Sequence, residues 1–166
     1  ESGKKRVIPL EQASDGEFAS DGKTLFFARL PRQKSFAKRY RGGLIENLWR
    51  FRTGDQEAIP LTADHDGTSR APMVWGKRLY FSTDRDGTMN LWSMNLEGKD
   101  LKQHTDFVGW DVLSPSLHEG RIIFRNRADI WIYDVKGDAA RKLDIHLATD
   151  FDQKRERWVS NPLSYL

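Results

Sequence analysis

The chain has 166 residues, of which 38% are hydrophobic and 11% aromatic, and its formal net charge is +3. This composition is enough for a folded core and excludes a disordered chain, and the small charge gives no reason to expect a nucleic acid partner. No apolar run approaches membrane-spanning length, and there is no cysteine for disulfides or thiolate chemistry. We therefore expect a soluble protein without a membrane partner, and the absence of cysteine fits the cytoplasm and the periplasm equally.

Short β-type runs bounded by glycine-bearing turns follow one another along the chain. They alternate aromatic and β-branched residues over a few positions, as strands do. Helical periodicity never lasts beyond a turn or two. The runs expected as strands are, in chain order, 25–27, 48–52, 79–81, 91–96, 122–124 and 130–135. Turn dipeptides such as Glu119-Gly120 lie before the earlier run of each pair and suit tight hairpins with a positive φ.

The runs repeat as a unit. Asn47-Leu48-Trp49, Asn90-Leu91-Trp92 and Asp129-Ile130-Trp131 hold the same place in successive units, and their tryptophans are 43 and 39 residues apart. Periods of about 40 residues with four short strands are typical of β-propeller blades, which must stack on neighbours to bury both faces. The sequence thus predicts an all-β partial β-propeller of about three four-stranded antiparallel blades, of the WD and TolB-like kind.

The repeat also predicts the division of the chain. Residues 11–62, 63–105 and 106–147 are expected to form the blades, 1–10 the outer strand of a preceding blade, and 148–166 a linker or the start of the next unit. Natural propellers close rings of about four to eight blades. We therefore expect a piece of a larger protein, whose open blade faces are covered by the rest of the parent polypeptide or by a second copy of this chain.

One segment interrupts the repeat. Residues 31–46 stand where the next blade needs only 83–89, and they form a basic insertion that contains aromatic residues. Long loops on a rigid scaffold are favoured places for function, although a solvated surface loop explains the same residues. The candidate substrate or partner contacts are Arg32, Lys34, Lys38, Arg39, Tyr40 and Arg41.

The chain resembles the tricorn protease family of serine peptidases over nearly its whole length. The resemblance rests on 38–43, which read Lys-Arg-Tyr-Arg-Gly-Gly, on Pro72-Met73-Val74-Trp75, on the run 80–92 that ends in Asn-Leu-Trp, and on 105–112. It implies that these residues are the last three blades of an N-terminal six-bladed propeller. It further implies that the parent cleaves peptides with a serine and a histidine that this chain lacks.

From this resemblance we expect no catalytic residue and no peptidase activity in the fragment. No Gly-x-Ser-x-Gly motif marks a nucleophile among its serines. Its expected role is a non-catalytic channel wall that filters peptides or guides them to the parent's active site. The alternative is a TolB-like propeller that acts as a protein-protein binding module, because one fold hosts many functions. A propeller-bearing prolyl peptidase is a third possibility, and the context of Met89-Asn90-Leu91-Trp92 favours the tricorn family over it.

Two segments resemble the start of a calcium-binding loop. Asp64-His65-Asp66-Gly67 and Asp84-Arg85-Asp86-Gly87 place carboxylates before a glycine, as calcium loops do. An EF-hand loop also needs a Glu six residues after the glycine, where Met73 and Ser93 stand, so tight turns capped by aspartate are favoured. The four histidines lie in different units without paired spacing, which disfavours zinc. We expect no metal and no cofactor.

Overall fold

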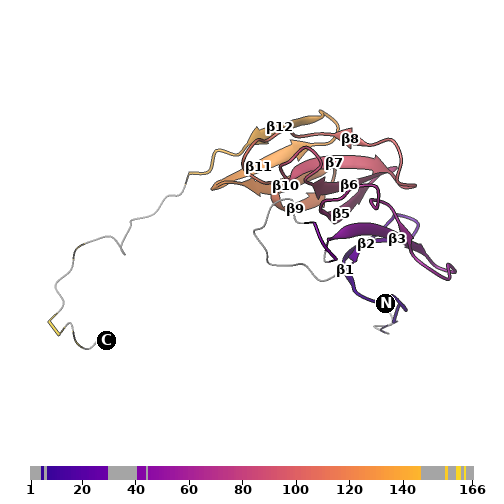
Figure 1. The fold of residues 1–166 in the computed structure, drawn as a ribbon. Helices are drawn as coiled ribbons and strands as arrows, with labels where there is room; N and C mark the ends of the chain where they lie inside the picture. The colour runs from indigo at the N-terminus through magenta and orange to yellow at the C-terminus, as the bar shows by residue number, and fades with distance from the viewer. Residues whose placement is uncertain are drawn as a thin grey trace.

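The computed structural model describes Lys5 and residues 7–29, 41–43, 45–146, 156, 160–161 and 163. Its strands form three four-stranded antiparallel sheets, each built from four strands consecutive in the chain (Figure 1). Helices are absent from the 12 secondary-structure elements of this described part, and none there is long and apolar enough to cross a membrane. The predicted all-β blade architecture is confirmed.

Each blade runs from an inner to an outer strand in sequence order. The first blade contains β1 (Ala13–Phe18), β2 (Thr24–Arg29), β3 (Asn47–Arg52) and β4 (Ile59–Pro60). The second contains β5 (Ser69–Trp75), β6 (Arg78–Thr83), β7 (Asn90–Asn95) and β8 (Lys102–Gln103). The third contains β9 (Leu113–His118), β10 (Arg121–Asn126), β11 (Asp129–Asp134) and β12 (Ala139–Lys142).

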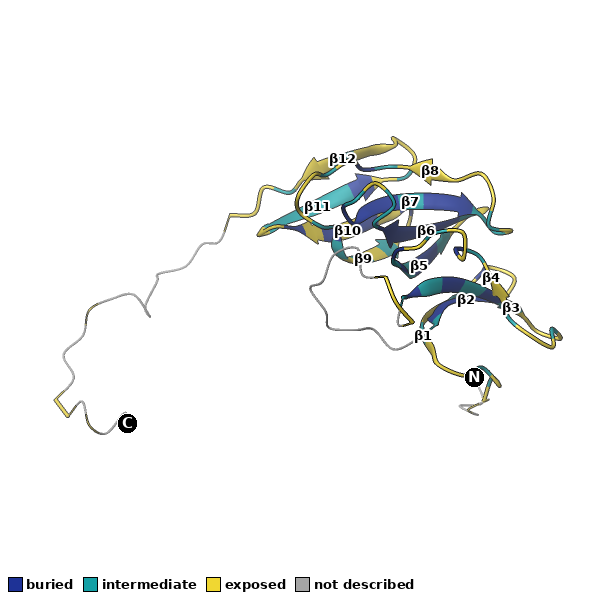
Figure 2. Cartoon of the chain, viewed as in Figure 1, coloured by how far each residue is buried: buried dark blue, intermediate teal, exposed yellow. Residues whose placement is uncertain are grey.

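The core lies between the blades. One buried cluster joins blades one and two through Phe26, Leu48 and Phe81, and a second joins blades two and three through Leu91 and Phe124. The most buried strands are β2 in the first blade and β6 and β7 in the second, while β4, β8 and β12 are largely exposed (Figure 2). Burial of this kind stabilises each sheet only through its neighbours, as expected for stacked blades.

The turn residues have the predicted conformation. Gly22, Gly76 and Gly120 have φ of 62°, 59° and 73°, and Glu119 has 46°. A side chain at Gly120 would also meet the Trp75 ring at 3.1 Å, because this hairpin packs against the preceding blade. Glycine is therefore required there by conformation and by packing.

The strand expected before the first blade stays a prediction. Residues 7–10 pair with no strand in the structure, and residues 1–4 and 6 lie outside the described part. The segment 148–166, expected to begin another unit, is likewise almost entirely outside it. In the third blade, at the other end of the row of blades, Ile123 of β10 is 47% exposed. Cover for that sheet face by a second copy or by the parent chain also remains a prediction.

Candidate functional site

The first strands of the three blades, β1, β5 and β9, lie side by side where the sheets converge (Figure 1). Each contains an irregularity at an equivalent place, where the register with the second strand shifts. The residue at the bulge has a positive φ in every blade: 48° at Asp15, 54° at Ala71 and 50° at Ser114. Bulges bend a strand and redirect its side chains, so the three strands share one bent surface.

This surface is hollowed. A depression of about 480 Å³ crosses all three inner strands. Its lining residues are Asp15, Gly16 and Glu17 of β1, Arg70, Ala71, Pro72 and Met73 of β5, and Ser114, Pro115, Ser116 and Leu117 of β9. We call it the inner-strand hollow. Its floor includes the buried Met73 and Pro72, while Asp15, Ser114 and Ser116 are exposed.

The charges of the inner-strand hollow are held in place by contacts between blades. Burial raises the pKa of the half-buried Glu17, and a hydrogen bond from the backbone of Val74 in the next blade opposes that rise. Arg70 lies 3.9 Å from the carboxylate of Glu46, whose side chain is only 5% exposed. The hollow thus combines carboxylates on the first blade, a guanidinium on the second and hydroxyls on the third.

Of the candidate contacts in the basic insertion, only Arg41 can be placed. Arg32, Lys34, Lys38, Arg39 and Tyr40 lie outside the described residues. Arg41 is exposed and lines a second hollow, of about 530 Å³, next to the two aspartate-glycine turns. The other residues of this Arg41 hollow are Asp64, His65, Asp66, Gly67, Asp84, Arg85, Asp86 and Gly87.

Two carboxylates around the Arg41 hollow, Asp64 and Asp84, accept hydrogen bonds from residues of the two turns. Arg85 donates to both oxygens of Asp64, at 2.9 and 3.0 Å, and this contact lowers the pKa of Asp64. Asp84 Oδ1 accepts from the Thr68 amide at 2.9 Å and contacts His65 Nε2 at 2.8 Å. Within the described part of the chain, no group of three or more acidic or histidine side chains stands together to hold a metal ion.

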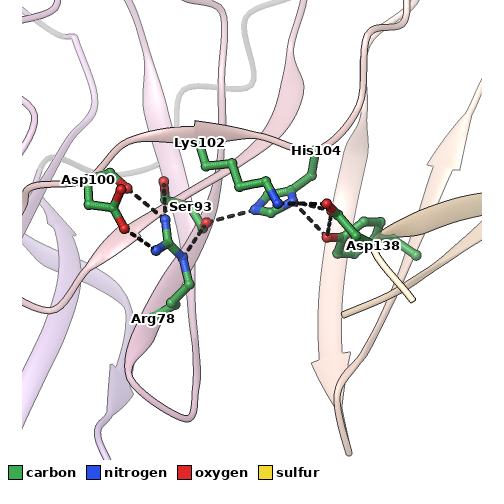
Figure 3. A network of polar contacts seen from close by, with 7 residues as sticks. Arg78, Ser93, Asp100, Lys102, His104 and Asp138 are labelled. Carbon is green, nitrogen blue, oxygen red and sulfur yellow. Dashed lines mark hydrogen bonds and ion pairs between the residues drawn. The ribbon is translucent and has the colours of Figure 1, made fainter. Parts of the chain in front are cut away.

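Apart from the two hollows, one cluster of polar side chains has the order of contacts of a serine hydrolase triad. Ser93 Oγ lies 2.7 Å from His104 Nε2, and His104 Nδ1 lies 2.9 Å from Asp138 (Figure 3). However, Ser93 is fully buried, and its hydroxyl accepts a hydrogen bond from Arg78 at 2.9 Å. A nucleophile must reach its substrate, so this cluster is a structural connection between blades two and three.

Burial and partners fix the protonation of this cluster. Burial lowers the pKa of His104, although the neighbouring Asp138 carboxylate acts in the opposite direction. Hydrogen bonds from Lys102, Tyr133 and His104 lower the pKa of Asp138. Burial raises the pKa of Tyr133, whose hydroxyl donates to Asp138 at 2.6 Å. These values favour a neutral histidine beside an ionised aspartate.

Sequence reasoning did not identify the inner-strand hollow. The available signals were Pro72 and Pro115, each inside a β-type run. Proline within a strand indicates an edge or a bulge because it has no backbone donor, and both prolines directly follow the residue of positive φ. The basic insertion differs in this respect, because its charge can be recognised in the sequence without knowledge of the fold.

Comparisons with known proteins agree with this architecture. Residues 1–139 match the family model described as the tricorn protease N-terminal beta propeller domain. A tricorn protease homolog of Saccharolobus solfataricus is 37% identical over 129 residues, which are 78% of this chain and 12% of that protein. Tricorn protease homolog 1 of Streptomyces coelicolor is 33% identical over 124 residues, 74% of this chain and 12% of its own length. The chain therefore spans about an eighth of these relatives.

Solved structures show the same fold. The crystal structure of the tricorn protease aligns with a TM-score of 0.68 and 27% identity, over 81% of this chain and 13% of that one. TolB from Acinetobacter baumannii aligns with a TM-score of 0.58 and 16% identity, over 81% of this chain and 33% of that one, a likeness of fold alone. From the matched family model and these relatives, the chain belongs to the tricorn protease N-terminal β-propeller family.

Proposed function

We propose that this chain is a non-catalytic wall segment of a propeller that guides peptides to the active site of a tricorn-like serine peptidase. The names of the relatives support a peptidase as the parent protein. The observation that carries the proposal is the inner-strand hollow, because three consecutive blades line one continuous depression, part polar and part apolar, on the side where they converge. Catalysis belongs to residues outside this chain.

The packing between the blades suits a wall. The Arg50 side chain of the first blade donates a hydrogen bond to the Leu96 carbonyl of the second at 3.1 Å, and it also forms an ion pair with Glu97. The Lys102 ammonium of the second blade donates a hydrogen bond to the Asp138 carboxylate of the third at 2.6 Å. These charged hydrogen bonds, added to the two buried clusters, connect each blade to the next. A rigid surface can sort peptides by size and shape, since it does not adjust to each one.

The proposal is tested on the full-length protein with a bulky residue in the inner-strand hollow. Ser116→Trp narrows the hollow, and Ser20→Trp makes the same change at an exposed turn between β1 and β2. We expect kcat/KM for long peptides to fall more than for short ones in Ser116→Trp, and neither to change in Ser20→Trp. Equal kcat/KM values for Ser116→Trp and the unmodified protein at every peptide length would remove the support for a guiding wall.

The Arg41 hollow supports a second candidate function. It opens among the loops that join the strands, next to the end of the basic insertion, and loops of this kind recruit partners in binding propellers. We propose the basic residues from Arg32 to Arg41 as the contacts of such a partner. Replacing 32–41 by a Gly-Ser linker would then abolish capture of a stable protein partner while peptide cleavage stays unchanged. A guiding insertion would instead alter the preferred peptide length.

A further inference from the structure

We propose that the inner-strand hollow binds the amino end of a peptide, with its ammonium group between the carboxylates of Asp15 and Glu17. The inference rests on the proposed passage of peptides along this wall, and it adds which end of the peptide is recognised. It follows from the shape of the hollow, from the balance of its charges and from the position of Arg70.

Both carboxylates line the hollow from the same strand, β1. Asp15 occupies the bulge of β1 with φ of 48° and is exposed. Glu17 lies two residues further on, half-buried, and a hydrogen bond from the backbone of Val74 holds its carboxylate toward the second blade. The bulge therefore directs two acidic side chains of the same strand to one depression.

The charges favour a cation as the ligand. Arg70 is the basic residue among those that line the hollow, and the buried Glu46 behind it offsets its charge at 3.9 Å. The third blade contributes the neutral hydroxyls of Ser114 and Ser116. Asp15 and Glu17 therefore determine the sign of the local field, which attracts a positive group over several ångströms.

The position of Arg70 favours an α-ammonium over a lysine side chain. In a peptide the α-ammonium is followed directly by a carbonyl, and the Arg70 guanidinium, which lines the same hollow, can donate to that oxygen. The ammonium of lysine is separated from its nearest amide by a flexible apolar stem. The apolar part of the floor, formed by Pro72, Met73 and Leu117, suits the first side chains of a short peptide.

The test is photo-crosslinking of the full-length protein with three tripeptides that carry a diazirine side chain. One has a free amino end, one is N-acetylated, and one is N-acetylated with a lysine as its first residue. Crosslinks are mapped by mass spectrometry to the inner strands 13–18, 69–75 and 113–118. We expect the free amine to give roughly ten times the yield of the acetylated peptide, the effect of losing a charge-assisted hydrogen bond.

Variants assign the effect to the two carboxylates. Asp15→Asn with Glu17→Gln removes both charges, and asparagine tolerates the positive φ at residue 15. We expect this double variant to reduce the yield of the free amine to that of the acetylated peptide. Glu57→Gln removes an exposed carboxylate outside the hollow and should change nothing. Circular dichroism of each variant checks that the fold is retained.

Three results would overturn the inference. Equal yields from the free and acetylated peptides exclude recognition of the amino end, and a preference for the acetylated lysine peptide assigns the ammonium to a side chain. A free-amine preference that persists in the double variant places recognition elsewhere. Equal crosslinking of all peptides to the inner strands would leave the guiding wall intact, and the length dependence of Ser116→Trp decides that function separately.

Discussion

The hydroxyl of Thr105 donates to the amide oxygen of Asn90 over 2.8 Å, in the buried centre of the second blade. The same hydroxyl accepts from the Leu91 backbone over 2.9 Å. The first blade repeats this pair with Asn47 and Thr62 at 3.2 Å. The pair ties the third strand to the segment after the fourth, which gives a physical reason for the recurring Asn-Leu-Trp run.

Removing the Thr105 hydroxyl tests this pair. Thr105→Val keeps the volume but leaves the Leu91 amide and the Asn90 side chain with one partner fewer, at a cost of roughly 1–3 kcal/mol for buried polar groups. We expect the free energy of unfolding of this chain to fall by that amount in urea, followed by tryptophan fluorescence. Thr68→Val is the control, since Thr68 is held through its backbone amide. Equal stability of the two variants would contradict the proposed role of the hydroxyl.

The repeat made the blades predictable from sequence. Strand spacing, the recurring Trp49, Trp92 and Trp131, and the turn glycines all follow from local patterns, because pleat period and positive φ are properties of short segments. The third blade departs from the recurring Asn-Leu-Trp pattern at its first position. It has Asp129 where the others have asparagine, and that carboxylate lies 3.7 Å from Lys142.

Contacts between blades could not be predicted in the same way. Glu17 and Val74, or His104 and Asp138, are far apart in sequence and meet only because whole sheets stack. Their meeting depends on the angle between blades, which no short pattern contains. The candidate contacts of the basic insertion rest on composition alone, and of these only Arg41 falls within the described residues.

Glu97 joins the second blade to the first. It pairs with Arg50, whose side chain is 8% exposed, and with Arg52 at 2.5 Å. Glu97→Gln removes the countercharge of the nearly buried Arg50, and we expect the free energy of unfolding to decrease by about 1 kcal/mol because the carboxylate itself is half exposed. Glu57→Gln serves as an unpaired surface control. An unchanged urea midpoint in Glu97→Gln would show that the pair adds nothing to blade packing.

Gly67 is required for a steric reason. A Cβ at this position would collide with Asp84 Oδ1 and with the ring of His65. We expect Gly67→Ala to break their 2.8 Å contact and to destabilise the chain by about 1–3 kcal/mol, the usual cost of overpacking. Gly137→Ala is a matched control, because a Cβ there would meet its nearest atom, an oxygen of Asp134, at an ordinary 3.5 Å. Thermal unfolding of both variants separates steric collision from a general intolerance of alanine.

His104 makes the stability of blades two and three depend on pH. Burial holds the pKa of His104 in the folded chain below its ordinary value of 6.5, which applies to the unfolded chain. As the pH falls through 6.5, the unfolded chain therefore takes up a proton that the folded chain does not, and the free energy of unfolding decreases. The slope from one such group is at most about 1.4 kcal/mol per pH unit. Above pH 6.5 His104 is neutral in both the folded and the unfolded chain, so the stability lost at lower pH is fully present there.

The neighbouring carboxylate acts in a separate window. The pKa of Asp138 is lowered in the folded chain, so its contribution is present above its ordinary value of 3.8 and is lost as the pH falls further. His104→Gln should therefore flatten the stability profile between pH 7 and 5 and leave the decline below pH 4 in place. Urea unfolding at a series of pH values measures both parts. Identical slopes for the variant and the unmodified chain between pH 7 and 5 would show that His104 is as easily protonated when folded as when unfolded, and that its bonds to Ser93 and Asp138 accommodate the charge.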